Sequence, residues 1–426
     1  MTVKSIQTCA EEWKSLPWEK FQKNLFKLQH RIYQAAKRND TNLIKKLQSL
    51  LIGSKCSKYL SVRQVTQIDE NKNKAGVDGF SSLNARQCFL LVENLALMSK
   101  VKHRRLRCIP VSKFKGKEKP HGMPTILDRT MQCLIKYALE PVYQANRINC
   151  SDFSSQYWYT NFQTHLIGNL QSNSNFPRIK ILQLDIMNSF DNIDYEKLLL
   201  SIILPGTAKK FLRSTLKAGV LNNRKFDIEE PKHGGRICQL LCEIALNGVE
   251  KNVIESFKRN EIKQKTIRHL NNILFFLKPY ESEDKLVIKL KEALATRGLN
   301  GQNIKTKLVF FKKGFNFLGL HFRLNNKYAC YPSKDNIKSI KSEIKTVLKN
   351  SRYALKQRIE IVANIYKHWC KYHKFCDMRQ VKSVLWFIRK WSYKFIRKKS
   401  NISAKHTANL TNSIFSKESH DLRFVH

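Results

Sequence analysis

The chain has 426 residues, of which 78 are lysine or arginine and 33 are aspartate or glutamate, so its formal net charge is +45. A hydrophobic fraction of 42% excludes a disordered basic tail, and the length is sufficient for two or three domains with hydrophobic cores. So large a positive charge indicates a polyanionic partner, and nucleic acid is the first candidate because neutralising its phosphates releases counterions.

An anionic membrane surface is the alternative partner, but the sequence predicts no membrane association. No segment approaches the about 20 uncharged apolar residues of a membrane span. The basic residues are also spread along segments that have folded patterns, not gathered on one amphipathic helix. The 11 cysteines include no C-x-x-C pair and no apolar signal segment precedes them, so we expect reduced thiols, mostly buried.

The first part of the chain is predicted to be helical. Residues 13–52 read as two amphipathic helices, since apolar residues recur there at helical spacing. Asp40 or Thr41 is expected to cap the second helix, and Gly53 to end it.

Residues 101–125 form a dense basic stretch that prolines and glycines interrupt, which predicts a loop or a strand and loop. Only Glu118 opposes its cations. A solvated charged loop is the simpler interpretation, but RNA contact is favoured because the cations repel one another unless phosphate lies close. The candidates here are Arg104, Arg105, Arg107, Lys113, Lys115, Lys117 and Lys119.

The middle of the chain alternates strands and helices. Residues 179–186 read as a buried strand that ends near Asp185, and a helix is expected from about Tyr195. Further predicted elements are a helix over 236–257, a strand over 273–277, and a turn over 315–319 between apolar strands.

From Pro332 onward the pattern is helical, basic and aromatic. Residues 351–400 contain fourteen lysines and arginines against Glu360 and Asp377. We expect Trp386 and Trp391 in the core, from their helical spacing with apolar neighbours. The cations that we expect to contact RNA are Arg352, Lys356, Arg358, Lys367, Lys371 and Lys374.

A cluster of histidines and cysteines in the same segment raises the question of a zinc site. Its spacing fits no common zinc pattern, and its members do not converge on one helical face, so no metal site is predicted. The cluster consists of His368, Cys370, His373 and Cys376.

Several segments, in order, resemble group II intron-encoded reverse transcriptases and maturases, over about residues 13–395. Those similar to the family's N-terminal extension and fingers are Leu28–Ile32, Ser61–Thr66, Ala75–Gly79, Arg105–Pro110, Gly116–Arg129 and Leu139–Val142. Those similar to its palm and thumb are Asp185-Ile186, Phe190–Ile193, Gly234-Gly235, Leu240-Leu241, Ile244–Glu250, Gly298-Leu299, Lys305-Thr306, Gly314–Gly319 and Trp369–Phe375. Arg63, in the second segment, joins the RNA-binding candidates.

The resemblance implies an α+β fold with right-hand, polymerase-like fingers and palm. A helical N-terminal extension and the start of the fingers are expected over 1–80, and the rest of a degenerate fingers and palm over 81–325. A helical thumb, the maturase X domain, is expected over 326–399, with a flexible polar tail over 400–426.

The resemblance also implies that polymerase chemistry is lost. Nucleotide addition uses two Mg²⁺ ions about 4 Å apart, which carboxylates hold. Asp185 stands at the first acid position of the family, but the paired acids are replaced by Asn271 and Asn272. Asp191 and Asp194 are weighed as substitute ligands, although helix capping is the preferred role for Asp194.

Smaller departures from the family pattern agree with this loss. His269-Leu270 replaces the residues before the paired acids, Lys232-His233 precedes Gly234, and Lys119 stands where the family has arginine. No cofactor is therefore expected, and Mg²⁺ would be needed only if the polymerase were active.

The expected function is that of a maturase, which binds structured group II, or related group III, intron RNA and assists its splicing. The alternatives are an active reverse transcriptase that supports intron mobility, and a basic RNA-binding protein without intron specificity. The abundance of Lys, Asn, Ile, Phe and Tyr fits an organellar protein. A plastid is the expected compartment, with the mitochondrion as the alternative.

Overall fold

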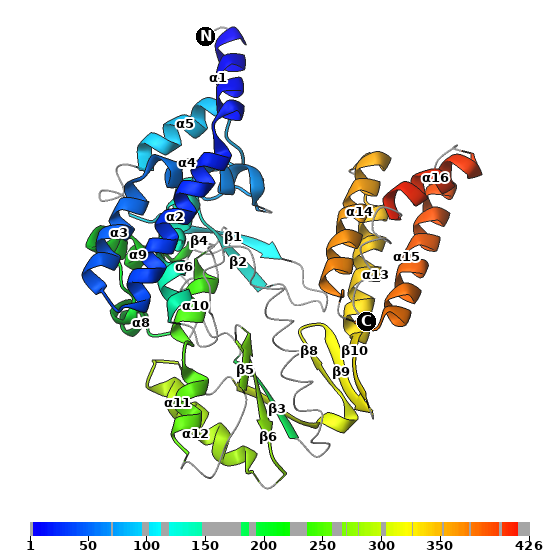
Figure 1. Ribbon diagram of the computed structural model, residues 1–426. Coiled ribbons are helices and arrows are strands. Elements are labelled where there is room, and N and C mark those ends of the chain that lie inside the picture. Colours follow the sequence, from blue (N-terminus) through cyan, green and yellow to red (C-terminus); the bar gives the residue numbers. More distant parts are fainter. Residues whose placement is uncertain are drawn as a thin grey trace. The chain divides into compact units, whose positions relative to one another are not determined.

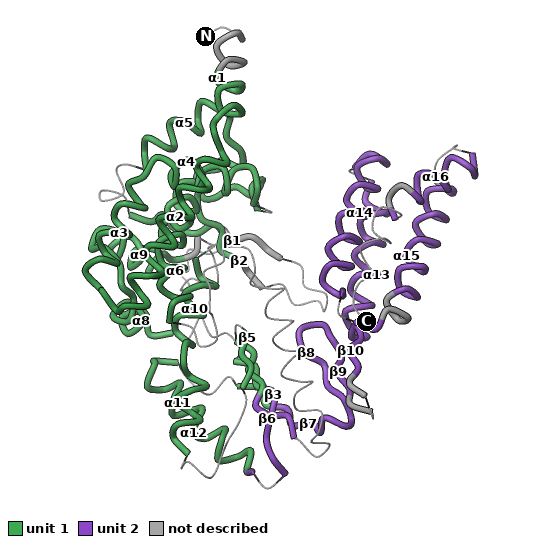
Figure 2. The backbone as a smooth tube through the Cα atoms, viewed as in Figure 1, with its two compact units in different colours: residues 1–157, 184–274, 282–306 green, residues 158–183, 275–281, 307–426 purple. Residues whose placement is uncertain are grey.

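In the computed structural model of this protein, helices form both ends of the described chain, and the strands lie between them together with further helices (Figure 1). Two compact units divide it, the first comprising residues 1–157, 184–274 and 282–306, and the second residues 158–183, 275–281 and 307–426 (Figure 2). The structure describes residues 3–69, 71–95, 102–111, 119–146, 180–186, 193–221, 237–257, 266–269, 271–279, 281–299, 304–325, 327–351, 353–374, 376–399 and 403–415.

The first unit begins with helices, as predicted. Asp40 caps α3, because its carboxylate accepts a 2.9 Å hydrogen bond from the backbone N–H of Leu43, and the helix ends at Gly53. Ser54 caps α4 in the same way. The helices of this part are α1 (Val3–Ser15), α2 (Trp18–Lys37), α3 (Thr41–Gly53), α4 (Lys55–Arg63), the π-helix η1 (Gln64–Ile68) and α5 (Ala85–Asn94).

Helix α6 (Ile126–Ala145) is the centre of the first unit, and most of its residues are buried. Helices α2, α3 and α4 pack against it. Two buried glutamines fix this packing: the side-chain amide of Gln29 donates to the carbonyl of Tyr137, and that of Gln48 donates to the carbonyl of Ala138. Such satisfied polar groups define the register between packed helices.

The described part of the basic stretch contains a pair of antiparallel strands, which confirms the strand in the predicted loop or strand and loop. Residues 112–118 lie outside the described residues. In strand β1, Arg107 pairs with Met123 of β2, and β4 runs parallel to β1. The elements around this sheet are β1 (Leu106–Val111), β2 (Lys119–Met123), α8 (Tyr195–Ser201), α9 (Gly206–Leu216) and β4 (Val220–Leu221).

A second, four-stranded sheet has the order β5-β6-β3-β7. The single helix predicted over 236–257 was wrong, because Gly248 adopts φ +74° and separates α10 from α11. Only glycine takes this left-handed conformation without strain. The elements are β3 (Lys180–Ile186), α10 (Cys238–Ala245), α11 (Val249–Glu255), β5 (Thr266–His269), β6 (Asn272–Leu277), α12 (Glu283–Ala295) and β7 (Ile304–Phe310).

The second unit contains a small antiparallel sheet and a helical bundle. Its sheet has the order β10-β9-β8. The turn predicted over 315–319 is confined to Leu318 and Gly319, both with positive φ, because residues 315–317 form β8. The bundle is helical, as the sequence predicted. The elements are η5 (Phe311–Lys313), β8 (Phe315–Phe317), β9 (Leu320–Asn325), β10 (Lys327–Pro332), α13 (Lys334–Lys349), α14 (Leu355–Tyr372), α15 (Met378–Lys399) and α16 (Ala404–Phe415).

Two expectations for the bundle need correction. Residues expected to form a loose tail instead form α16, whose Thr407 and Thr411 are buried and whose Phe415 ring lies 4.7 Å from the ring of Tyr366. Trp386, expected in the core, is 61% exposed. Within the described residues, no helix is long and apolar enough to cross a membrane.

Candidate functional site

Asp185, Asn271 and Asn272 lie together where β3 ends and β6 begins, and we call them the Asp185 site. The amide of Asn271 donates a 2.9 Å hydrogen bond to the Asp185 carboxylate and a second, of 3.1 Å, to the carbonyl of Ile186. The backbone N–H of Ile186 donates back to the carbonyl of Asn271. The side-chain amide of Asn272 donates to that of Asn271 over 3.4 Å. The three residues that the sequence aligned with the palm acids therefore meet in space.

The electrostatics of the Asp185 site do not fit a pair of magnesium ions. Partial burial raises the pKa of Asp185, and the neighbouring cation Lys305 opposes that rise. The site offers one carboxylate and two neutral amides, whereas a hard dication prefers carboxylate oxygens. The Asn271 amide donates to one oxygen of the Asp185 carboxylate, so a protein group occupies part of its acceptor capacity.

Asp191 and Asp194, considered above as substitute magnesium ligands, do not change this conclusion. Asp194 caps α8, because its carboxylate accepts hydrogen bonds of 3.0 and 3.1 Å from the backbone of Glu196 and Lys197. Its predicted capping role is confirmed. Asp191 lies outside the described residues, as do Leu270 and the segment 232–235. Among the residues that are described, no group of three His, Cys, Asp or Glu side chains is placed to hold a metal.

A buried ionic network, which we call the Arg268 network, lies in the same unit. The Arg268 guanidinium contacts the carboxylates of Glu250 at 3.2 Å and Glu243 at 3.3 Å, and the Tyr143 hydroxyl donates to Glu243. Burial lowers the pKa of Arg268, but Glu250, Tyr143 and Glu243 outweigh it and hold the pKa above its ordinary value. The sequence analysis missed this network. Its one signal was Glu243, a charged residue between the apolar residues of a helix.

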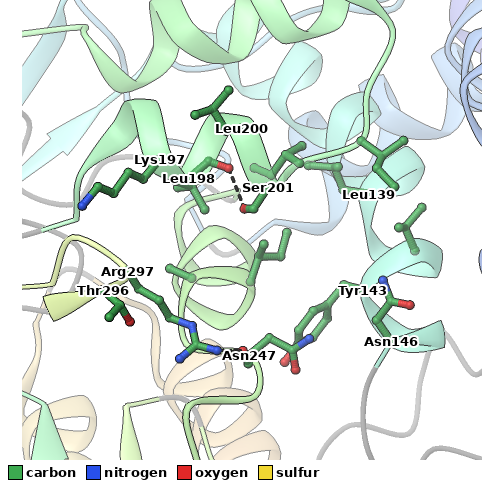
Figure 3. A pocket seen from close by; sticks show the side chains of 15 residues that line it. Leu139, Tyr143, Asn146, Lys197, Leu198, Leu200, Ser201, Asn247, Thr296 and Arg297 are labelled. Carbon is green, nitrogen blue, oxygen red and sulfur yellow. Dashed lines mark hydrogen bonds between the residues drawn. The ribbon is translucent and has the colours of Figure 1, made fainter. Parts of the chain in front are cut away.

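A cavity of about 450 Å³ lies in the first unit, and Figure 3 shows its lining. Residues of α6 and α8 meet there with the turn after α10 and the end of α12. Arg297 is half-buried and donates a 3.1 Å hydrogen bond to the carbonyl of Asn247, and burial lowers its pKa. Lys197 and Thr296 add polar groups to a lining that also contains Leu139 and Leu198. None of these residues belongs to the Asp185 site.

The predicted basic stretch presents its arginines to solvent. Arg105 and Arg107 are exposed on either side of Leu106, which is buried, as the alternation of a strand requires. Arg104 is also exposed, and its backbone N–H donates to the buried carboxylate of Asp128. Lys113, Lys115 and Lys117 lie outside the described residues, as does the side chain of Lys119.

Arg63 is half-buried at the end of α4, unlike the exposed arginines of the basic stretch. Its guanidinium lies 4.5 Å from the ring centroid of Trp18, which in turn packs edge-on against Trp13 and Phe21. Arginine stacks well on aromatic faces because its charge is delocalised over a plane. Arg63 therefore has a packing role here, and its contact with RNA stays a prediction.

The candidates of the helical bundle fall into two groups. Lys356, Lys367, Lys371 and Lys374 are exposed. Arg358 instead donates to the carbonyls of Tyr353, at 2.7 Å, and Leu348, at 3.1 Å, so it ties the end of α13 to the start of α14. Arg352 lies outside the described residues.

The histidines and cysteines of the bundle have separate partners. The Nδ1–H groups of His368 and His373 donate to the carbonyls of Asn364 and Trp369. The thiol of Cys376 instead lies 3.7 Å from that of Cys330. Burial lowers the pKa of His373 to about 4, which keeps its ring neutral.

Two family models and a relative of known name match most of this chain. A model described as the N-terminal domain of reverse transcriptase matches residues 13–95, and one described as reverse transcriptase (RNA-dependent DNA polymerase) matches residues 109–322. Maturase-like protein 1 of Euglena gracilis is 31% identical over 88% of this chain and 80% of its own length. The chain belongs to the group II intron maturase and reverse-transcriptase family. The predicted resemblance is thereby confirmed.

Two further similarities complete the comparison. Maturase-like protein 1 of Euglena longa is 29% identical over 91% of this chain and 83% of its own. A solved structure, telomerase from Candida albicans in complex with a TWJ fragment of telomeric RNA, is similar at 12% identity and a TM-score of 0.39, over 77% of this chain and 65% of that one. The reverse-transcriptase domain agrees with the predicted polymerase-like α+β fold.

Proposed function

We propose that this protein is an intron maturase that binds structured group II, or related group III, intron RNA and promotes its splicing. We further propose that its reverse-transcriptase activity is lost. The proposed loss rests on Asn271 and Asn272, which are neutral residues at the positions of the paired acids, and on the hydrogen bond by which the Asn271 amide contacts the remaining acid, Asp185. In this proposal the RNA performs the transesterification, and the protein stabilises the folded state of the RNA.

The distribution of charge supports RNA binding. The net charge of +45 favours a polyanion, and exposed cations include Arg105 just before β1, Arg107 in β1, and Lys367 and Lys371 in α14. The Maturase-like names of the two Euglena proteins also favour the maturase over a general basic RNA-binding protein. For the compartment we propose an organelle, with a plastid preferred over a mitochondrion, from the Lys- and Asn-rich composition.

The decisive experiment compares splicing of the host intron with and without the purified protein at low Mg²⁺ concentration. The RNA needs most help there, because few cations are present to neutralise its phosphates. We expect faster splicing with the protein, and equal rates contradict the proposal. A competition between the intron and an unrelated structured RNA at one salt concentration tests specificity. Near-equal affinities support the general RNA-binding alternative.

Primer extension on an RNA template tests the polymerase alternative. The proposed function predicts no cDNA at any Mg²⁺ concentration. Mg²⁺-dependent cDNA that disappears in the Asp185→Ala variant would instead establish an active reverse transcriptase.

A further inference from the structure

The outward side of α15 exposes two neighbouring aromatic rings. Val384, Leu385 and Ile388 are buried, so the helix already packs an apolar face into the bundle. Trp386 is nevertheless 61% exposed, and Phe387 is 43% exposed. An indole contributes to folding mainly through the apolar area that it buries. The position of Trp386 therefore indicates a contact outside the fold.

The exposed rings stand in a strongly positive environment. The Lys390 ammonium lies 4.6 Å from the ring centroid of Trp386, and that of Lys341, on α13, lies 4.2 Å from the ring centroid of Phe387. The sequence of α15 contains no aspartate or glutamate. Its exposed cations are Lys382, Arg389, Lys390, Lys394, Arg397 and Lys398. We call the two rings and these cations the α15 surface.

The spacing along the helix places Trp386 and three cations in one line. Lys382, Trp386, Lys390 and Arg397 follow one another at intervals of four and seven residues, so they share a side of the helix. At 1.5 Å per residue, the line from Lys382 to Arg397 is about 22 Å long. This length accommodates several nucleotides of an extended strand, with phosphates at the cations and one base at Trp386.

We propose that the α15 surface binds an unpaired segment of RNA and that Trp386 stacks on one of its bases. The proposal rests on the RNA binding argued above and adds the kind of RNA segment and the residue that recognises it. Unpaired bases are required because bases within a duplex are already stacked and present no free face to a side chain. Stacking on aromatic side chains tolerates any base, while the cations hold the backbone.

An anionic membrane is the rival partner for a helix with tryptophan and lysine residues. A helix that lies in a membrane interface inserts a continuous apolar face. In α15 that face is occupied, since Val384 and Ile388 are buried in the bundle. Two rings among six exposed cations fit a nucleic-acid strand better.

The test measures the affinity of the full-length chain for an unstructured single-stranded RNA oligonucleotide and for a hairpin duplex with the same number of phosphates. For Trp386→Ala we expect about five- to hundredfold weaker binding of the single strand, from the loss of one stacked base. We expect less than about twofold change for the duplex, and partial recovery with Trp386→Phe.

Two further measurements separate stacking from charge. Trp386→Ala should leave the slope of log affinity against log salt unchanged, whereas Lys390→Gln should reduce it by about 0.7. The matched control is Ile288→Ala on α12, because Ile288 is an apolar residue with a similar exposure of 56%. It should bind both RNAs as the unmodified chain does. Thermal unfolding of each variant verifies that the fold is kept.

Three results would overturn the proposal. One is unchanged single-strand binding by Trp386→Ala, and another is an equal loss on the duplex. The third is a Trp386→Ala variant that binds both RNAs normally but no longer binds phosphatidylserine vesicles, which would assign the α15 surface to a membrane. The splicing assay is independent of these measurements. A chain that does not promote splicing but binds single strands through Trp386 disproves the proposed function and keeps this inference.

Discussion

Arg268 lies in β5 and Asn271 lies directly before β6, and the two residues belong to sites that differ in the charged groups they contain. The Arg268 network is complete, with the arginine and Glu243 both about 5% exposed. In the Asp185 site, amides stand where the family carries carboxylates. A buried ion pair stabilises the fold only while both partners remain. Paired carboxylates instead repel one another unless metal is bound. The chain therefore keeps the charges that its fold needs.

Of the substitutions considered, replacement of Arg268 is expected to lower the free energy of unfolding most. Arg268→Met leaves the buried carboxylate of Glu243 without the cation that it contacts, and an uncompensated buried charge costs about 3–5 kcal/mol of unfolding free energy. Urea denaturation followed by circular dichroism measures the loss. Where the variant is insoluble, proteolysis of the freshly synthesised chain reports the same destabilisation.

The matched control is Arg213→Met in the same unit. Arg213 contacts Glu196 at 2.7 Å, but both side chains are about half exposed, so solvent screens the pair. Its loss should cost much less unfolding free energy than the loss of Arg268, since Lys217 also contacts Glu196. Equal costs for the two variants would remove the distinction between a structural network and a surface ion pair.

Restoring an acid to the Asp185 site is expected to give the next largest effect. Asn271→Asp replaces an N–H donor with a second carboxylate beside Asp185, which should cost about 1–3 kcal/mol without metal. Millimolar Mg²⁺ should recover part of this stability, because a dication offsets the repulsion. Thermal unfolding with Mg²⁺ and with EDTA measures both changes.

The Asn271→Ala variant separates the loss of the hydrogen bond from the repulsion between two carboxylates. It removes the same hydrogen bond but adds no charge, so it should cost about 1 kcal/mol and show no response to Mg²⁺. If Asn271→Asp matches the unmodified chain with and without Mg²⁺, the amide is not what satisfies Asp185.

Local patterns predicted the elements that position the Asp185 site. The apolar run before Asp185 predicted β3, and the resemblance placed Asn271 and Asn272 beside it. The Arg268 network could not be predicted in this way, because Tyr143 and Arg268 are 125 residues apart in sequence. Their contact depends on how α6 packs, which no local pattern encodes.

The errors in the bundle have a similar origin. Trp386 and its apolar neighbours fit a helical pattern whether the ring faces the core or solvent, so the spacing alone did not decide its exposure. The polar composition after Lys399 suggested a loose tail, yet Thr407 and Thr411 are buried in α16. The hydroxyl of Thr411 satisfies itself by donating to the carbonyl of Thr407 one turn earlier.

The smallest expected effect is a pH dependence at Asp185. Burial raises the pKa of its carboxyl, and Lys305 opposes the rise. An acid with a raised folded-state pKa adds stability below its ordinary pKa, and this stability is lost as pH rises through the raised value. Asp185→Asn should therefore gain unfolding free energy relative to the unmodified chain from pH 3 to pH 7, by less than about 1 kcal/mol because the group is partly exposed.

Urea denaturation of both chains across that pH range measures the gain at Asp185. Lys305→Met sharpens the measurement, because without the cation the pKa of Asp185 should rise further and the pH-dependent difference should widen. A difference that stays constant with pH, or that favours the unmodified chain at neutral pH, would show that the ionised carboxylate is well stabilised by its surroundings. The Asp185 site would then resemble the Arg268 network in stabilising its charged groups, and the proposed difference between the two sites would be wrong.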